Sequence, residues 1–121
     1  MSGKPPISID DGALMVTELL EKFPDTDCIF CVSDLPAFGA LSTLKANGRR
    51  VPHDIGVAGF GNFEVSRFAT PTLSTVIVDP RRIGEATGQL LAELLNESSD
   101  SERASRHVSV ESVVSLRGST K

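Results

Sequence analysis

The chain has 121 residues, of which 40% are apolar and 23% charged, and its net charge is −4. This length predicts one domain with a core, and the acidic balance argues against a standalone nucleic-acid-binding protein, which usually carries a basic patch. No apolar run approaches the roughly 18 residues of a membrane span, and the N-terminus lacks the apolar stretch of a secretory signal.

The N-terminal part of the chain predicts one helix. Residues 1–6 are expected to form a flexible lead-in. Asp10 and Asp11 then place negative charge where it favours a helix start, and Pro24 ends the helix because proline cannot continue it. The predicted helix covers residues 10–23, and its apolar stripe contains Leu14, Met15, Val16, Leu19, Leu20 and Phe23.

A short apolar run, Cys28 to Val32, follows the helix, and Ser33 and Asp34 come directly after it. A run of this length is typical of a strand that is covered on both faces. Ligands of open parallel sheets bind outside the carboxyl ends of the strands, so Ser33 and Asp34 are the first candidate ligand contacts. The alternative for Asp34 is a helix N-cap, and one residue can serve both roles.

Cys28 and Cys31 have the C-x-x-C spacing of some metal and redox sites. Within a strand, however, residues three apart point to opposite faces, and no second cysteine pair or nearby histidine completes a set of metal ligands. We interpret both as buried structural thiols, which fits a reducing cytoplasm. The sequence predicts no metal and no cofactor.

A second loop, Gly61 and Asn62, follows the strand predicted over residues 55–60. It falls at the carboxyl end of that strand and is therefore the second candidate ligand loop. A plain turn is the alternative, because both residue types tolerate a positive φ. The neighbouring predicted elements are a helix over 35–46, a short helical turn over 64–67 and a strand over 73–78.

The last third of the chain predicts a helix over 80–95, with Asp79 as its cap and Pro80 in its first turn. An exposed loop over 96–106 and a half-buried strand over 108–116 are expected to follow. The apolar side chains expected to be buried are Ile83, Leu90, Leu91 and Leu94 in the helix and Val108, Val110, Val114 and Leu116 in the strand.

Helices and strands alternate along the whole chain. This order predicts an α/β fold with a mostly parallel sheet and helices on both faces, a three-layer sandwich. The order opens with a helix, although in a βαβ sheet that helix should follow a strand. We therefore expect that a strand before residue 7 is missing and that the chain is part of a larger protein.

Four segments follow one another in fixed order: FCVSDLPAFGAL at 30–41, GRRVPHDIGVAGF at 48–60, TPTLSTV at 70–76 and LRGST at 116–120. Together they resemble the C-terminal part of LacI/GalR-family transcriptional regulators. The resemblance implies a helix-turn-helix DNA-binding domain and a two-lobed effector domain similar to periplasmic sugar-binding proteins. Residues 7–121 would be the C-terminal lobe, with a last segment that contributes to the lobe crossing; the DNA-binding domain and first lobe are absent.

The resemblance also implies an effector site in the cleft between the lobes. Ser33 and Asp34 occupy the strand-end positions that are often Asn-Asp in the family. The family often has an acidic residue at the position of Gly61, which Asn62 follows here, and some members have a stacking aromatic residue at the position of Ile7. These departures imply a different or more polar contact with a small effector of the sugar or sugar-acid class.

By the same resemblance, the protein forms a homodimer through its effector domains. The helix over 35–46 and the segment 62–70 would lie at the interface, and its candidate apolar contacts are Phe38, Leu41 and Phe68. The alternative is that the two phenylalanines belong to the core. Operator DNA would be contacted only through the absent N-terminal domain, and no membrane partner is expected.

The predicted function is therefore that of a cytoplasmic regulator whose effector shifts the population of lobe arrangements. One alternative is a periplasmic-type solute-binding protein on the same fold. A receiver-like signalling module is a second, although the acidic pair and the lysine that it needs at its strand ends do not occur. An enzyme is not expected, since the sequence has no G-x-S-x-G motif, no phosphate loop and no clustered histidines.

Overall fold

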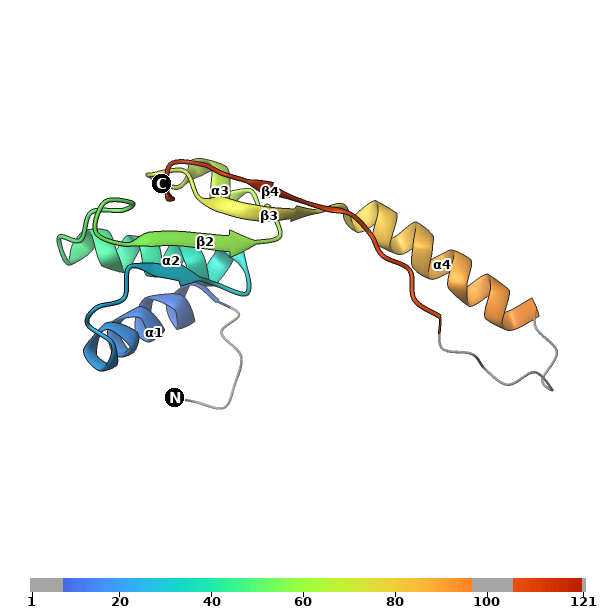
Figure 1. Cartoon of the computed structure of the whole chain (residues 1–121), viewed down its shortest axis with the longest axis horizontal. Helices are drawn as coiled ribbons and strands as arrows, with labels where there is room; N and C mark the ends of the chain where they lie inside the picture. The colour runs from blue at the N-terminus through green and yellow to red at the C-terminus, as the bar shows by residue number, and fades with distance from the viewer. Residues whose placement is uncertain (1–7, 97–105, 121) are drawn as a thin grey trace. The chain divides into compact units, whose positions relative to one another are not determined.

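The computed structural model describes residues 8–96 and 106–120. They belong to two compact units (Figure 1): a first unit of residues 1–77 and 114–121, and a second unit of residues 78–113. The predicted lead-in over 1–6, Ile7 and most of the predicted loop over 96–106 fall outside the described residues. No helix in the described ranges is long and apolar enough to cross a membrane.

The described strands form one sheet in the order β1-β2-β3-β4, and both the β1–β2 and the β2–β3 pairs are parallel. This arrangement confirms the predicted α/β class with a mostly parallel sheet. Observed element ends differ from the predicted ones by one or two residues, except that the strand expected over 108–116 is much shorter. The elements are α1 (Ile9–Lys22), β1 (Cys28–Phe30), α2 (Asp34–Ala46), β2 (Gly56–Phe60), α3 (Val65–Phe68), β3 (Ser74–Val78), α4 (Pro80–Asn96) and β4 (Ser112–Ser115).

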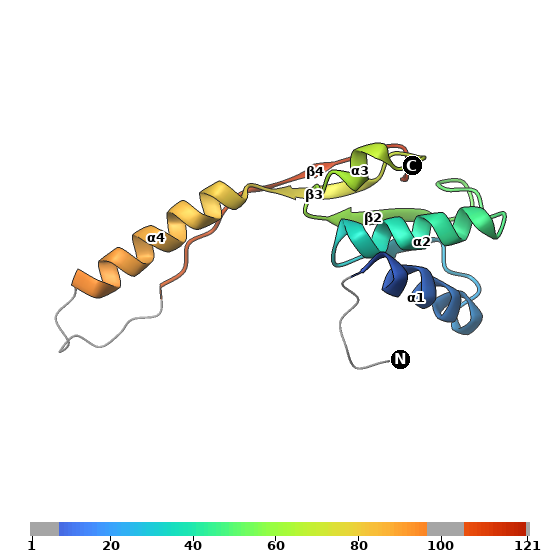
Figure 2. The same ribbon diagram turned by 180° about the vertical axis from the view of Figure 1, so that it is seen from behind.

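In the first unit, α1 packs against α2, and α2 packs against β2 (Figure 2). Helix α1 begins with a capping box, in which Ser8 and Asp11 each accept a hydrogen bond from the other's backbone N–H. The two helices approach closely because two glycines lie where they meet. A Cβ atom on Gly12 would overlap the carbonyl of Pro36, and one on Gly39 would overlap the carbonyl of Ile9.

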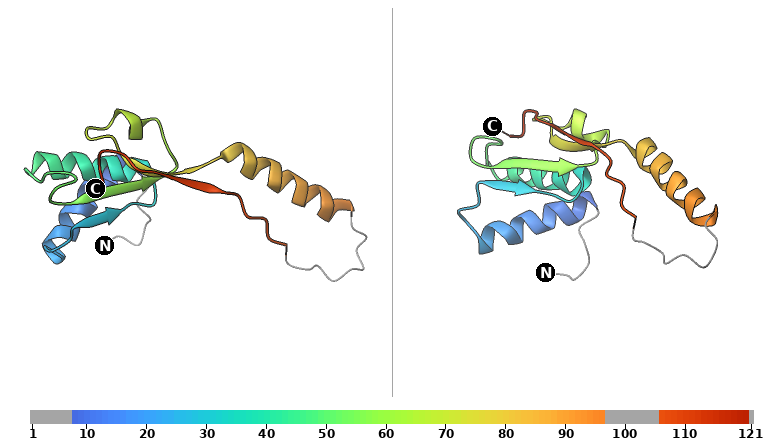
Figure 3. Two further views of the ribbon diagram at one scale, coloured as in Figure 1. Left: turned by 45° about the horizontal axis from the view of Figure 1, so that its top comes forward. Right: turned by 45° about the vertical axis from the view of Figure 1, so that its right-hand side comes forward.

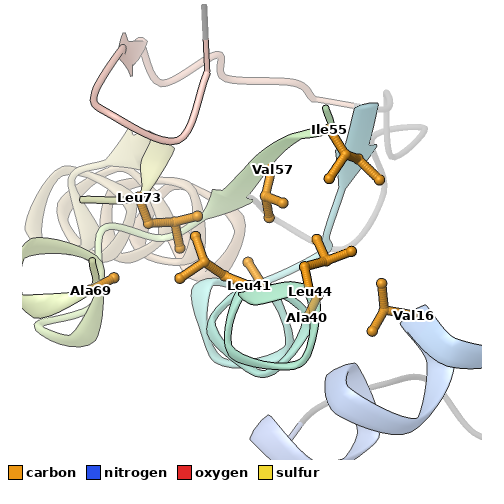
Figure 4. Close-up of a cluster of buried hydrophobic side chains, with 9 residues drawn as sticks. Val16, Ala40, Leu41, Leu44, Ile55, Val57, Ala69 and Leu73 are labelled. Atoms are coloured by element: carbon orange, nitrogen blue, oxygen red, sulfur yellow. The ribbon is translucent and has the colours of Figure 1, made fainter. Parts of the chain in front are cut away.

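The hydrophobic core lies between α2, β2 and the inner face of α1 (Figure 4). It is built from small and branched side chains, which suits the close approach of the helices. Its buried members are Val16, Ala37, Ala40, Leu41, Leu44, Ile55, Val57, Ala69 and Leu73.

Several expectations about burial are wrong for this chain. Three of the side chains that were expected to be buried in the last strand are exposed: Val108 (54%), Val114 (64%) and Leu116 (73%). The strand after α1 is not covered on both faces: Ile29 packs against the core, whereas Phe30 is 62% exposed, because α1 and α2 cover only one side. The apolar stripe of α4 is not buried either. None of that helix's residues is buried, and Leu94 is 46% exposed. Helix α4 lies in the second unit, whose described residues offer no second apolar layer.

An apolar groove of about 190 Å³ runs between α1 and β1, with Met15, Leu19 and Cys31 in its lining. Both cysteines are free, but Cys28 is exposed, so the expectation that both are buried is wrong for Cys28. Burial raises the pKa of the Cys31 thiol from 9.0 to about 11, which keeps that thiol protonated and unreactive at neutral pH.

The end of the chain closes the first unit at the amino ends of β2 and β3 (Figure 3). Ser119 is fully buried there. Its hydroxyl donates to the Val57 carbonyl (2.6 Å) and accepts from the Ser74 N–H (2.8 Å). Its own N–H donates to the Thr72 carbonyl, and its carbonyl accepts from the Val57 N–H, both at 2.9 Å. Ser119 therefore links β2 and β3 at their amino ends, where the pairing between the two strands begins.

We predict that Ser119→Ala lowers the free energy of unfolding by about 2–4 kcal/mol, because it leaves the Val57 carbonyl and the Ser74 N–H buried with one partner fewer. Urea unfolding measures this change. Ser42→Ala, on the exposed side of α2, is the matched control and should change stability by less than about 0.5 kcal/mol. Equal effects of the two variants would contradict the bridging role.

Candidate functional site

Ser33 and Asp34 lie where β1 leads into α2, at the carboxyl edge of the sheet. Ser33 is the N-cap of α2: its backbone is extended, and its Oγ accepts from the Leu35 N–H at 3.5 Å. Asp34 is the first residue inside the helix. The interpretation of Asp34 as the N-cap is therefore wrong by one residue. Ser33 is half-buried, so part of it is accessible at this edge.

The Asp34 side chain lies beneath the surface, with 0% exposure. Its Oδ2 accepts from the Phe63 N–H at 2.7 Å, and its Oδ1 accepts from the Thr75 hydroxyl at 2.6 Å. Gly59 provides the space, because a Cβ atom there would overlap Asp34 Oδ1. The carboxylate therefore joins the start of α2 to the loop after β2 and to β3. Direct effector contact by Asp34 stays a prediction, and this burial argues against it.

Gly61 and Asn62 begin the loop after β2, and both have a positive φ, 112° and 54°. The backbone is thus the turn that the residue types allowed. A Cβ atom on Gly61 would lie 2.7 Å from Cε2 of Phe63, so an acidic side chain at this position would displace that ring. The Asn62 N–H donates to Thr75 Oγ1 at 3.3 Å. The same hydroxyl therefore joins Asn62 to Asp34.

Sequence reasoning missed two residues of this region, Thr75 and Arg117. Arg117 Nη2 donates to Asn62 Oδ1 at 2.8 Å, and Arg117 Nη1 donates to Ser66 Oγ at 2.7 Å and to the Leu73 carbonyl at 3.1 Å. In the sequence, Arg117 stands out only as part of the family motif at 116–120. That motif does not indicate a partner 55 residues away.

The structure therefore brings the two predicted loops together and adds Thr75 and Arg117 between them and α3. Ile7 lies outside the described residues. Ser33 and Asn62 are the half-buried polar side chains left at this edge. In the described parts of the chain, no group of three or more His, Cys, Asp or Glu side chains is placed to hold a metal ion.

The three candidate dimer contacts differ in how deeply their side chains are buried. Phe68 is 76% exposed at the end of α3, so it does not belong to the core. Phe38 is half-buried and packs against the core, and Leu41 is a core residue with 2% exposure. A depression of about 410 Å³ lies over these three residues, with Ser42, Lys45 and Thr70 in its lining.

Comparison with known proteins assigns the chain to a family. A family model described as a periplasmic binding protein-like domain matches residues 5–120. The chain belongs to this family. Its relatives include the HTH-type transcriptional regulator CelR of Thermobifida fusca, 37% identical over 84 residues, and the HTH-type transcriptional repressor PurR of Pasteurella multocida, 37% identical over 95 residues. These matches cover 69% and 78% of this chain.

Solved structures agree with this assignment. A LacI family transcriptional regulator from Silicibacter pomeroyi is similar with a TM-score of 0.81 and 51% identity, over 98% of this chain and 41% of that one. A CelR–cellobiose complex has a TM-score of 0.81 and 31% identity, with coverage of 95% and 34%. A LacI family regulator from Arthrobacter sp. FB24 in complex with lactose has a TM-score of 0.76 and 31% identity, with coverage of 94% and 43%.

These findings confirm the resemblance to LacI-family regulators that the motifs predicted. The chain spans only about a quarter of the length of these curated relatives, 25% of CelR and 28% of PurR.

We predict that Asp34→Ala lowers the free energy of unfolding by about 3 kcal/mol or more, because it leaves two buried donors, the Phe63 N–H and the Thr75 hydroxyl, without their charged acceptor. Asp34→Asn should cost about 1–2 kcal/mol, since the amide oxygen can still accept from the Phe63 N–H and its NH2 group can donate to the Thr75 hydroxyl, but neither bond is charge-assisted. Urea unfolding tests the order. If Asp34→Ala lowers the free energy of unfolding no more than Asp25→Ala does, at an exposed position, the predicted role of the Asp34 carboxylate is contradicted.

Proposed function

We propose that this chain is the effector-sensing and dimerisation lobe of a LacI-family transcriptional regulator, and that it acts in the cytoplasm without catalysis. The observation that carries the proposal is the hydrogen-bonded edge in which Asp34, Thr75 and Arg117 join both candidate ligand loops to α3. The names of the relatives support a regulatory role.

The proposed effector is a small sugar or sugar acid. Ser33 and Asn62 offer a hydroxyl and an amide, groups that can each donate to and accept from the hydroxyl groups of such a ligand. The cellobiose and lactose complexes among the structural neighbours support this class. One lobe supplies only one side of a cleft, so we expect the isolated chain to bind weakly.

The proposed dimer surface combines the exposed side of α2 with α3 and residues 62–70. Phe68 supports this proposal because a phenylalanine that is 76% exposed beside a shallow depression is costly to leave in water. Operator DNA would be bound by an N-terminal domain outside this chain. An effector that prefers one lobe arrangement would shift the population of arrangements, and the DNA-binding domains would respond.

The coding sequence upstream of residue 1 distinguishes this proposal from its main rival. A helix-turn-helix followed by a first lobe would support a regulator. A secretory signal in front of that lobe would contradict it and favour a solute-binding protein on the same fold.

For the isolated chain, we predict that calorimetry with cellobiose, lactose and gluconate gives dissociation constants weaker than about 1 mM. The reason is that half of the cleft is absent and the loss of several hydrogen bonds costs about 1 kcal/mol each or more. Micromolar binding by this lobe alone would contradict the shared-cleft mechanism.

For the dimer surface, we predict that Phe68→Asp reduces the self-association of the regulator, since it places a charge in an apolar contact. Light scattering over a concentration series measures the change in mass. Phe23→Asp is the matched control: Phe23 is also exposed, at the C-terminal end of α1, and its replacement should leave the mass unchanged. An unchanged mass for Phe68→Asp would contradict this interface.

A further inference from the structure

The guanidinium of Arg117 connects the second candidate ligand loop to the helix that carries Phe68. We propose that Arg117 is a positioning residue that couples the hydrogen bonding of the Asn62 amide to the position of α3. The inference rests on the proposed function in one respect: the ligand that would act on Asn62 is the effector. The geometric part concerns three hydrogen bonds of one planar group.

The first step concerns the orientation of the Asn62 amide. A guanidinium has five N–H donors and no acceptor, so the group that faces Arg117 Nη2 at 2.8 Å must be Oδ1 of Asn62. The NH2 end of the amide is thereby turned away from Arg117. Among the described residues, no acceptor pairs with it, so it remains able to donate to an oxygen of a ligand. Arg117 thus decides which end of the amide a ligand meets.

The second step concerns α3. This helix has only four residues, and Glu64 at its N-cap makes no side-chain capping bond, so its position depends on contacts from elsewhere. Arg117 Nη1 donates to Ser66 Oγ at 2.7 Å, and that hydroxyl donates to the Phe63 carbonyl at 2.7 Å. The guanidinium is planar and rigid, so its two terminal nitrogens move together. Arg117 therefore holds α3 and the loop after β2 in a fixed position relative to each other.

The third step concerns charge. The ion pairs within the described residues involve Arg50, Arg81, Arg82 and Arg106, so Arg117 is held only by neutral oxygens there. The bond to Asn62 Oδ1 is one of three side-chain hydrogen bonds that hold Arg117. A change in the strength of this bond therefore changes a large share of the interactions that hold the guanidinium in place. A ligand that polarises the Asn62 amide would strengthen the bond, and one that turns the amide would break it.

The test is amide hydrogen exchange of the full chain, read at Ser66, Arg67 and Ala69, whose N–H groups donate to Phe63, Glu64 and Val65. Asn62→Gly removes the acceptor and tolerates the positive φ. We expect it to speed exchange at these amides by about tenfold, the effect of losing one hydrogen bond to a charged group. Asn62→Asp keeps an acceptor and should leave exchange unchanged or slower.

The same two variants are then placed in an Arg117→Gln background. If the coupling runs through Arg117, Asn62→Gly speeds amide exchange at α3 by less than about twofold in this background. Asn62→Asp then no longer slows that exchange. If Arg117→Gln fails to fold, Arg117→Lys serves as the background, because it keeps the charge but loses the fork. Arg49→Gln, at an exposed arginine, is the control and should leave α3 unchanged.

Two results would overturn the proposal. One is exchange at α3 that stays within twofold in Asn62→Gly. The other is additive effects of Asn62→Gly and Arg117→Gln, which would mean that Arg117 only holds the end of the chain. No effector is needed for this readout, so absence of sugar binding would count against the proposed function alone, whereas these two results would count against the coupling alone.

Discussion

The buried carboxylate of Asp34 is the constraint on which the carboxyl edge of the sheet depends. A buried charge without partners costs several kcal/mol, whereas an ordinary hydrogen bond contributes about 1 kcal/mol. The loop after β2 must therefore bring the Phe63 N–H to Asp34, and β3 must bring its Thr75 hydroxyl. These two requirements fix the backbone around Asn62 and the start of α3. The candidate ligand loops lie together because one acid needs donors from both sides.

The parts of this edge that could be predicted are those that follow from parallel strands. Ser33 and Asn62 follow two strands, and the carboxyl ends of neighbouring parallel strands meet, so their proximity needed no tertiary information. The depth of Asp34 could not be predicted, because it depends on the missing side chain of Gly59 on the neighbouring strand. The role of Arg117 could not be predicted for a similar reason. Its partners lie 44 to 55 residues earlier in the chain, and no local sequence pattern indicates them.

Periodicity indicated which faces are apolar but not what covers them. The stripe of α4 and the outer side of β1 are apolar, yet Leu91 is 55% and Phe30 62% exposed. Large exposed apolar surfaces in a protein usually mark contacts with another segment or molecule. The chain spans about a quarter of the length of the curated relatives it matches, and the outer side of β1 and the stripe of α4 are exposed surfaces of this kind.

The bridge formed by Ser119 has a consequence for the order of folding. Its partners Val57, Thr72 and Ser74 are made early, whereas Ser119 follows only after the whole second unit, residues 78–113. At roughly 5–20 residues per second, the ribosome needs about 2–9 s to extend the chain from Ser74 to Ser119. During this time the amino ends of β2 and β3 lack the hydrogen bonds that Ser119 supplies, and unpaired strand ends of this kind expose a nascent chain to aggregation.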